Sequence, residues 1–345
     1  MRAAVLYGPN DLRPAEVKTP RIASDEVLVR VRACAICGTD LRIIDGTKSR
    51  GVHFPSIIGH EIAGEIAELG SDVKGLAVGE RVAIAPVVPC LSCYYCKRAR
   101  ENTCLNREAI GYEYDGGFAE YVRIPAKAMA AGNVYPIPAH LSFEEAALAE
   151  PLACCLNGNE ISRIGLGDTV LLVGAGPIGL MHLQLARAAG ASQVIVSELL
   201  PHRREAALRF GAGLVVDPSE TDLSEFVRAH TDGLGVDQVM MAIGASRVVN
   251  QAISLARKGG TINLFAGFPG KGETSIESNL IHYNEAIVTG TSSSARRHYA
   301  KALNLIASGV VKVKDLVTKE FPIEDVQEAV AATRRGEGFK TIVTP

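Results

Sequence analysis

The stretch 168–198, DTVLLVGAGPIGLMHLQLARAAGASQVIVSE, joins a short apolar run, a glycine turn, a helical pattern and a second apolar run. Its GAGPIG segment fits the pattern G-x-G-x-x-G between a strand and a helix, within a unit of about 30 residues. Gly174 permits the tight turn, Gly176 lets the backbone approach a pyrophosphate, and Gly179 lets the helix pack closely on the strand. The unit therefore predicts a dinucleotide-binding site.

The helix after this turn begins with Pro177 and Ile178, and its free N–H groups would face the bound anion. Glu198 closes the second apolar run, where a carboxylate accepts hydrogen bonds from the adenosine ribose and repels the extra phosphate of NADP. Arg203 and Arg204 act against this preference, since a nearby arginine could serve a 2′-phosphate. The unit thus predicts NAD, with NADP less favoured; a purely structural glycine turn is the alternative.

Alternation of apolar runs and helical patterns continues beyond this unit and predicts a doubly wound parallel sheet. Strands are expected at 213–217, 236–244, 260–267 and 285–291, and helices at 221–230, at 246–258 and after Pro201. Ligands of such sheets lie at the carboxyl ends of the strands. The residues expected near the cofactor are therefore Gly244, Ala266, Gly267, Phe268 and Thr291.

The remaining segments predict a second domain. A chain of 345 residues exceeds the usual size of one core. Its first 150 residues carry short valine- and alanine-rich runs between Gly, Pro and Asp, which is typical of a mostly β domain. A helical connection is expected at 142–164, and helices at 296–308 and 324–335 precede a last strand at 339–345. We expect a catalytic domain at 1–152, a nucleotide domain at 153–291, and a C-terminal return to the first domain at 292–345.

Composition restricts the partners. A formal net charge of -2 gives no reason to expect nucleic acid or an anionic membrane as a partner. No run of eighteen apolar residues is present to span a bilayer, and the N-terminal residues lack the features of a signal peptide. We expect a cytoplasmic protein whose thiols stay reduced, and in that compartment clustered cysteines indicate a metal more often than a disulfide.

Two groups of residues have metal-ligand chemistry. Four of the eight cysteines lie between residues 90 and 104, and zinc accepts four thiolates tetrahedrally, so this segment predicts a closed structural zinc site. Incidental free cysteines are the alternative. The structural ligands would be Cys90, Cys93, Cys96 and Cys104.

The second group offers one sulfur, one nitrogen and one oxygen donor, from Cys37, His60 and Glu61. Catalytic zinc uses about three protein ligands and keeps one position open for water or substrate. Spacing alone is weak evidence here, and a satisfied core or surface histidine remains the alternative for His60.

These groups and the glycine turn, in this order, resemble the zinc-dependent medium-chain alcohol and polyol dehydrogenases over essentially the whole chain. The branch with sorbitol (L-iditol) and L-threonine dehydrogenases is the most similar. This resemblance implies a GroES-like catalytic domain, a Rossmann domain that binds NAD, two zinc ions per chain, and a homo-oligomer, commonly a dimer or tetramer. The matching segments are 37–40, 59–61, the four-cysteine segment, 150–152 and 174–179.

The resemblance also implies roles for single residues. Cys37 and His60 would hold the catalytic zinc. Glu61 would be a further ligand, either at all times or in alternation with water. Glu150 stands where related alcohol dehydrogenases place a second cysteine; its carboxylate would bind the zinc or hold its water, and a helix-surface carboxylate is the alternative. Thr39 would accept the proton of a substrate hydroxyl made acidic by zinc, or would cap a helix.

The chain departs from its relatives at two places. Arg42 stands where many of them carry the last histidine of a proton relay, and arginine cannot accept a proton. L-Threonine is therefore less favoured as a substrate. The arginine usual after the last Rossmann strand of the sorbitol branch is replaced by the small residues 291–294. A basic run at 296–298 is expected as a solvated helix start, with an anionic substrate group as the alternative.

The predicted activity is hydride transfer from a secondary alcohol of a polyol or sugar alcohol to NAD, giving a ketone. L-Threonine 3-dehydrogenase and a general secondary alcohol dehydrogenase are the alternatives within this family. A non-catalytic zinc- and nucleotide-binding protein is an alternative of another class, and a zinc-free quinone reductase is a third. The intact zinc and glycine motifs argue against the non-catalytic binding protein, and the four-cysteine segment argues against the quinone reductase.

Overall fold

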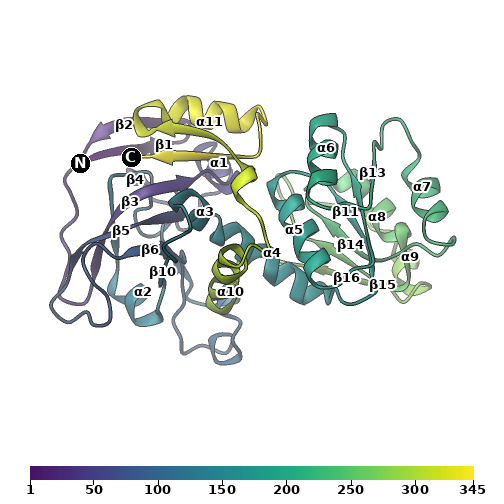
Figure 1. Ribbon diagram of the computed structural model, residues 1–345, viewed down its shortest axis with the longest axis horizontal. Coiled ribbons are helices and arrows are strands. Elements are labelled where there is room, and N and C mark those ends of the chain that lie inside the picture. The colour runs from purple at the N-terminus through teal and green to yellow at the C-terminus, as the bar shows by residue number, and fades with distance from the viewer. The chain divides into compact units, whose positions relative to one another are not determined.

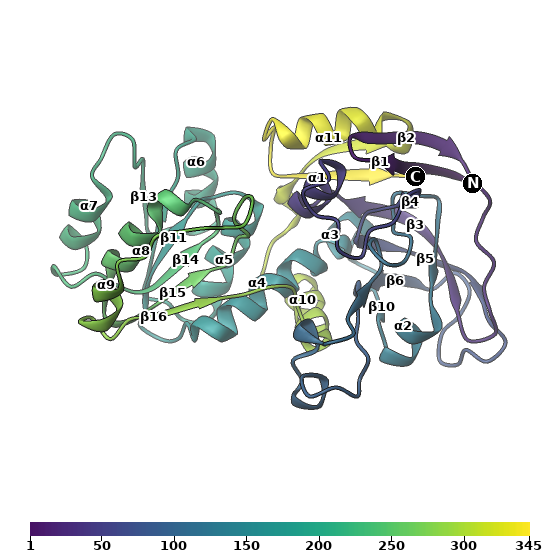
Figure 2. The same ribbon diagram turned by 180° about the vertical axis from the view of Figure 1, so that it is seen from behind.

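The computed structural model describes all residues from 1 to 345 and divides the chain into two compact units (Figures 1 and 2). Unit 1 combines Met1–Ala153 with Ser294–Pro345, and unit 2 is the continuous segment Cys154–Ser293. None of the helices is both long enough and apolar enough to cross a membrane.

The main sheet of unit 1 has the order β10-β6-β5-β3-β18-β17, with β9 also paired to β3. Residues of β3 and β18 are almost all buried, as central strands require. The C-terminal strand lies beside an N-terminal one, because Ile342 pairs with Ala35 and Val343 with Cys34. The strands are β3 Val27–Ala35, β5 Glu61–Leu69, β6 Arg81–Ile84, β9 Tyr121–Ile124, β10 Val134–Pro136, β17 Val317–Pro322 and β18 Lys340–Thr344.

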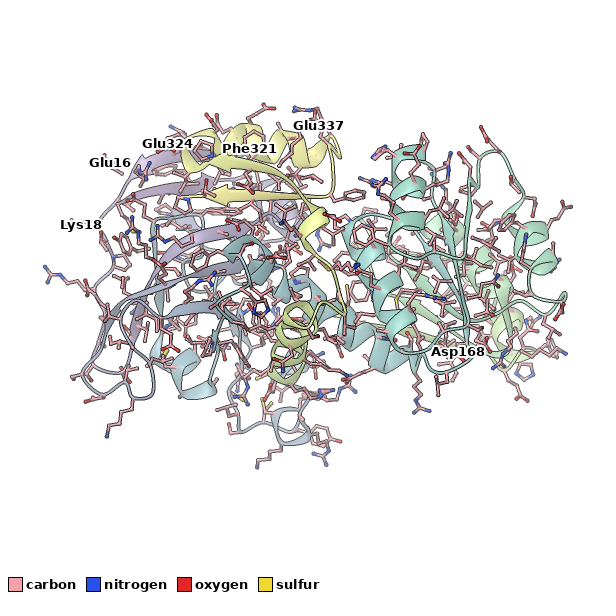
Figure 3. All side chains as sticks on the ribbon, viewed as in Figure 1. Glu16, Lys18, Asp168, Phe321, Glu324 and Glu337 are labelled. Carbon is pink, nitrogen blue, oxygen red and sulfur yellow. The ribbon has the colours of Figure 1, made fainter.

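A second sheet of unit 1 pairs β2 and β4 with β1, and helix α11 packs beside it (Figure 1). Arg2 of β1 forms an ion pair with Glu324, which Figure 3 labels just before α11. A small pair, β7 and β8, flanks the cysteine-rich segment. The elements are β1 Arg2–Gly8, β2 Asp11–Glu16, β4 Ser56–Ile57, β7 Val87–Val88, β8 Glu108–Ala109, α1 Gly38–Ile44, α2 Ala126–Ala131, α3 Phe143–Ala147, α10 Arg296–Ala307 and α11 Val326–Arg334.

Unit 2 is a six-stranded, fully parallel sheet with the order β13-β12-β11-β14-β15-β16. Helices α5 and α6 lie over one face and α8 and α9 over the other (Figures 1 and 2). The predicted fold class, a mostly β domain with a doubly wound domain, is confirmed. The elements are β11 Thr169–Val173, α5 Pro177–Ala188, β12 Gln193–Ser197, α6 Pro201–Arg209, β13 Leu214–Val216, α7 Leu223–Ala229, β14 Val236–Met241, α8 Val249–Leu255, β15 Ala256–Leu264, α9 Ser278–His282 and β16 Ile287–Gly290.

The helix expected at 246–258 ends at Leu255, because Ala256 already pairs with Val236 and opens β15, so this boundary was wrong. The expected helical connection at 142–164 is present as two helices, α3 and α4 (Ala149–Ser162). Ser142 fixes the start of α3, since its Oγ accepts from the Glu145 amide at 3.1 Å while the Glu145 carboxylate accepts from the Ser142 amide at 3.0 Å.

His182 is an unusual core residue of unit 2. It lies on α5, is 1% exposed, and meets the ring of Phe265 edge-on at 4.4 Å between centroids. Neither of its ring nitrogens has a hydrogen-bond partner. Burial lowers the pKa of His182 to about 3. The folded protein therefore holds a neutral imidazole that the unfolded chain would protonate below its ordinary pKa of about 6.5.

This difference predicts a loss of stability in mild acid. Between about pH 6.5 and pH 3 the unfolded chain binds a proton at His182 that the folded chain does not, so folding is disfavoured by about 2 kcal/mol at pH 5. We expect His182→Leu to remove this part of the pH dependence, measured as the free energy of unfolding at pH 7 and pH 5. His202→Leu, at an exposed position of α6, is the control. An unchanged pH dependence in His182→Leu would contradict this account.

Candidate functional site

Strand pairing in unit 1 brings the three mixed donors together. Glu61 opens β5 and pairs with Ala35 at the end of β3, so the chain just beyond β3 carries Cys37 to the start of β5. The Cys37 sulfur, a ring nitrogen of His60 and a carboxylate oxygen of Glu61 all lie within 4.8 Å of one another. His60 and Glu61 are buried, and Cys37 is partly exposed. Solvent or a substrate can therefore reach the group from the thiol side.

Asp40 holds two members of this group in position. It is fully buried, and its Oδ1 lies 3.1 Å from His60 Nδ1 while its Oδ2 accepts from the Cys37 amide at 2.8 Å. A carboxylate on one ring nitrogen orients the imidazole and leaves Nε2 to act as the ligand. Cys37 is the N-cap residue of α1, and the Asp40 carboxylate, from the third helical position, accepts from its amide; Thr39 is therefore not the cap. Sequence reasoning assigned no role to Asp40, although it lies within the matched segment 37–40.

Lys340 of β18 is the second residue that the sequence did not reveal. Its Nζ lies 2.7 Å from Glu61 Oε1 and 2.5 Å from Oε2, and it donates to the Ile36 carbonyl at 3.0 Å. Both side chains of the ion pair are buried. Burial raises the pKa of Glu61 to about 7, although the Lys340 ammonium acts to lower it. The ion pair fixes one carboxylate directly beside the candidate metal ligands.

Glu150 lies near this group without belonging to it. It sits in the first turn of α4, is 6% exposed, and its charge contributes to raising the pKa of Glu61. The alternative of a helix-surface carboxylate is therefore wrong. The three-residue donor group does not include Glu150. Burial raises the pKa of Tyr299, and the Glu150 charge raises it further. The buried Oη of Tyr299 has no hydrogen-bond partner.

Thr39 and Arg42 contact each other on α1. The Arg42 Nη2 donates to Thr39 Oγ1 at 3.0 Å. The threonine hydroxyl thus accepts a hydrogen bond from a permanent cation, and its own O–H can donate to another acceptor. Because arginine cannot take up a proton, the pair can polarise a hydroxyl but cannot extend a relay.

The donors present fit a catalytic zinc ion. Thiolate, imidazole and carboxylate are the ligands that zinc uses, and three of them leave a fourth position open. The imidazole already has its supporting hydrogen bond from Asp40, as metal-bound histidines usually do.

The four cysteines fit a second, closed zinc site. Their sulfur atoms are 3.5 Å apart for Cys93 and Cys96, 3.9 Å for Cys93 and Cys104, and 3.4 Å for Cys90 and Cys104. Four thiolates at about 2.3 Å from a tetrahedral zinc lie about 3.8 Å from one another. All eight cysteines of the chain are free thiols.

In the basic run at 296–298 only Arg297 is exposed, so Arg296 and His298 do not form the solvated helix start that the sequence predicted. Arg296 donates to Glu101 Oε1 through Nη2 at 2.6 Å and through Nε at 3.1 Å, and its amide donates to Glu101 Oε2 at 3.0 Å. It also donates to the Ala131 carbonyl, and His298 is 1% exposed. The guanidinium therefore ties the cysteine-rich segment to α10, and the expectation was wrong because its partner lies about two hundred residues earlier in the chain.

Unit 2 forms a pocket at its glycine turn. Gly174 has φ +101°, which favours glycine, and a Cβ on Gly179 would lie 2.0 Å from the Gly174 carbonyl. Gly176 precedes α5, and a Cβ there would meet only an Arg203 nitrogen at 3.9 Å. Open space thus remains where a pyrophosphate would approach, next to Pro177 and Ile178 at the helix start. The pocket has a volume of about 390 Å³ and is lined by residues that include Gly174, Glu198, Arg203, Ser219, Arg247 and Gln251.

Glu198 and the two arginines differ in their contacts. Glu198 Oε2 accepts from the Ala175 amide at 2.8 Å and Oε1 from the Leu200 amide at 3.0 Å. Arg204 is engaged in an ion pair with Asp217, whereas the buried Nε of Arg203 has no partner. Only Arg203 of the pair faces the pocket.

The other expected cofactor residues lie beyond the carboxyl ends of β14, β15 and β16, at one edge of the sheet. A Cβ on Gly244 would lie 2.2 Å from the Gly267 carbonyl, so these two loops pack tightly. Thr291 exchanges hydrogen bonds with Asn263 of β15. The pocket around Glu198 is lined by none of the five expected residues Gly244, Ala266, Gly267, Phe268 and Thr291.

Known proteins resemble the chain along its full length. Residues 23–138 match the alcohol dehydrogenase GroES-like domain, and residues 177–308 match the zinc-binding dehydrogenase domain. Sorbitol dehydrogenase of Bacillus subtilis (strain 168) is 35% identical, over 100% of this chain and 97% of that protein. D-Arabitol-phosphate dehydrogenase of Enterococcus avium is 32% identical, over 95% and 92%.

A solved structure is also similar. It is described as a zinc-binding dehydrogenase of Sinorhizobium meliloti 1021 bound to NADP. It superposes with a TM-score of 0.93 at 34% identity, covering 100% of this chain and 99% of that one.

Proposed function

This chain belongs to the family of zinc-binding alcohol and polyol dehydrogenases with a GroES-like domain and is an oxidoreductase, and from that premise we propose that it oxidises a secondary hydroxyl of a polyol to a ketone with NAD. The convergence of Cys37, His60 and Glu61 within 4.8 Å carries the proposal. A buried donor set with one exposed side is suited to a metal that must also meet a substrate.

The residues of unit 1 would act as follows. A zinc ion held by Cys37, His60 and Glu61 would supply a Lewis acid that lowers the pKa of a substrate hydroxyl. Thr39 Oγ1 would accept the departing proton while its own hydroxyl proton passes to water or another acceptor, because Arg42 donates to Thr39 and cannot take up a proton. Asp40 keeps the imidazole oriented, and Lys340 compensates the Glu61 charge. The Cys90, Cys93, Cys96 and Cys104 group would hold a second, structural zinc.

A polyol fits this donor set better than a simple alcohol. A carboxylate, Glu61, stands in the group, and another, Glu150, is buried nearby where related enzymes use a thiolate. Oxygen donors make zinc a harder acid, which suits substrates that present several hydroxyls. The similarity to sorbitol dehydrogenase supports the same substrate class.

NAD is the cofactor that Glu198 favours. Two backbone amides hold its carboxylate at the pocket wall, where it repels a 2′-phosphate. We expect Glu198→Ala to shift the ratio of kcat/KM for NADP to that for NAD upward by about 10-fold or more, because Arg203 and Arg247 then face a phosphate without a competing charge. Arg209→Ala, at an exposed position of α6 outside the pocket, is the control. An unchanged ratio would contradict this assignment.

One panel of substrates tests the activity. Polyols, simple secondary alcohols, L-threonine and sugar acids are each supplied with NAD and with NADP, and reduced nucleotide is followed by its absorbance. Oxidation of polyols with NAD supports the proposal. Turnover of none of these alcohols by zinc-loaded protein would overturn it.

We also propose a homo-oligomer in a reducing, cytoplasmic environment. The eight free thiols are compatible with such an environment. The edge strand β16 of the parallel sheet carries Ile287, which is 54% exposed, and an uncovered edge of this kind can pair with another chain.

A further inference from the structure

Two cationic side chains of unit 1, Lys48 and Arg42, lie near the candidate metal ligands, and the charge of a third acts on Lys48. The Lys48 ammonium lies 3.4 Å from the ring centroid of Tyr112, whose ring in turn lies 5.3 Å from that of His60. The Lys48 amide donates to the Arg42 carbonyl at 3.0 Å, so Lys48 folds back onto the end of α1. Arg107 is the third cation, since its charge acts on Lys48.

These cations have no acidic partners of their own. Neither Lys48 nor Arg107 forms an ion pair, and the Arg42 guanidinium contacts only the Thr39 hydroxyl. Of the nearest carboxylates, Asp40 is committed to His60 and the Cys37 amide, and Glu113 accepts from the Ala109 amide.

The cations are also close enough to repel one another. Burial, followed by the charge of Arg107, lowers the pKa of Lys48 to about 8. Lys48 and Arg107 are half-buried, whereas Arg42 is exposed. An anion beside the two half-buried cations would relieve their mutual repulsion. The other basic group expected to meet an anionic substrate is not available, because Arg296 is already paired with Glu101.

We propose that Lys48 and Arg107, flanked by Arg42, form a subsite for an anionic substituent of the substrate, which is therefore a polyol phosphate or a polyol carboxylate rather than a neutral polyol. The inference rests on the proposed function, whose substrate class it narrows. A phosphate ester or a carboxylate presents several acceptor oxygens to ammonium and guanidinium donors. Tyr112 places this subsite one aromatic ring away from His60, so the reacting hydroxyl and the anion belong to one small molecule.

Matched substrate pairs test the subsite. The values of kcat/KM are measured for D-arabitol and its 5-phosphate, for galactitol and its 1-phosphate, and for galactitol and galactonate. We expect the charged member to be preferred by about 10-fold or more, since charge-assisted hydrogen bonds contribute this much to binding. The preference should fall as salt is added. Comparison of the phosphate and carboxylate pairs identifies the anion.

Three variants separate charge from packing. We expect Lys48→Met to reduce the charged-to-neutral ratio of kcat/KM by about 10-fold or more, mainly through KM. Lys48→Arg keeps the cation above Tyr112 and should retain most of the ratio. Lys74→Met removes an exposed lysine of the same unit and should leave the ratio unchanged. Equal loss in Lys48→Met and Lys48→Arg would indicate a structural role and overturn the subsite.

Binding of inorganic phosphate gives a readout without turnover. Calorimetry on the zinc-loaded protein should detect phosphate binding that Lys48→Met weakens by about 10-fold or more. Suppose that neutral polyols are oxidised as efficiently as charged ones, and that Lys48→Met changes neither the charged-to-neutral ratio of kcat/KM nor phosphate binding. The subsite proposal is then wrong, while the proposed activity stands. If no alcohol is oxidised, the activity fails, and phosphate binding alone decides on the subsite.

Discussion

Cys37→Ser should lose alcohol oxidation by at least about 100-fold, since even the residues that support metal ligands contribute 10- to 100-fold and a ligand should contribute no less. The variant should still bind NAD, because the nucleotide pocket is built entirely from unit 2, whereas Cys37 lies in unit 1. Steady-state kinetics, nucleotide titration and elemental analysis measure the three quantities. Zinc content should fall from about two ions per chain to about one.

Cys154→Ser is the matched control, because Cys154 of α4 forms no disulfide and lies outside both donor groups. It should retain activity and both zinc ions. Full activity in Cys37→Ser would contradict the assignment of the mixed donor group as the reaction centre. Loss of both zinc ions would indicate that the variant is misfolded, and Cys37→Ala would then be measured for nucleotide binding to separate the two effects.

Lys340→Met should lower the free energy of unfolding by about 3 kcal/mol or more, because it leaves the Glu61 carboxylate buried without its counter-charge. Lys340→Met combined with Glu61→Gln should recover much of this loss, since no uncompensated charge then remains. Denaturant unfolding of the zinc-free variants measures both values, because a zinc ion on Glu61 would itself compensate the carboxylate.

Lys319→Met is the control for Lys340→Met. Lys319 lies on the neighbouring strand β17 and pairs with Glu337, but both side chains of this pair are partly exposed. Water compensates such a pair when it is broken, so a much smaller loss is expected. Equal losses in the two variants would show that burial of the Lys340–Glu61 pair contributes nothing.

Features that follow from neighbouring residues could be predicted from the sequence. The glycine turn and its flanking strands predicted the parallel sheet because each crossover is a local unit, and the fold class is confirmed. The resemblance to zinc-dependent dehydrogenases is likewise confirmed. It could be recognised because each matched motif is short and its residues lie close together in the sequence. The assignments of single site residues stay predictions that the variants above test.

Features that depend on distant residues could not be predicted. Lys340 reaches Glu61 only because β18 inserts beside β3, and no pattern in the last strand marks a lysine that faces inward. Arg296 looked solvated because its partner, Glu101, lies in another part of the chain. The helix boundary at Leu255 was missed for a related reason, since pairing with Val236 outweighs the helical tendency of the residues that follow.

The split course of unit 1 has a consequence for biosynthesis. Its sheet needs β18, whose residues are made after those of unit 2, whereas Cys154–Ser293 can fold as soon as it emerges from the ribosome. The β3 edge that β18 covers must therefore wait unpaired until β18 takes its place between β3 and β17. Nascent chains stalled before residue 340 should present a finished nucleotide fold and an exposed β3 edge that chaperones can bind.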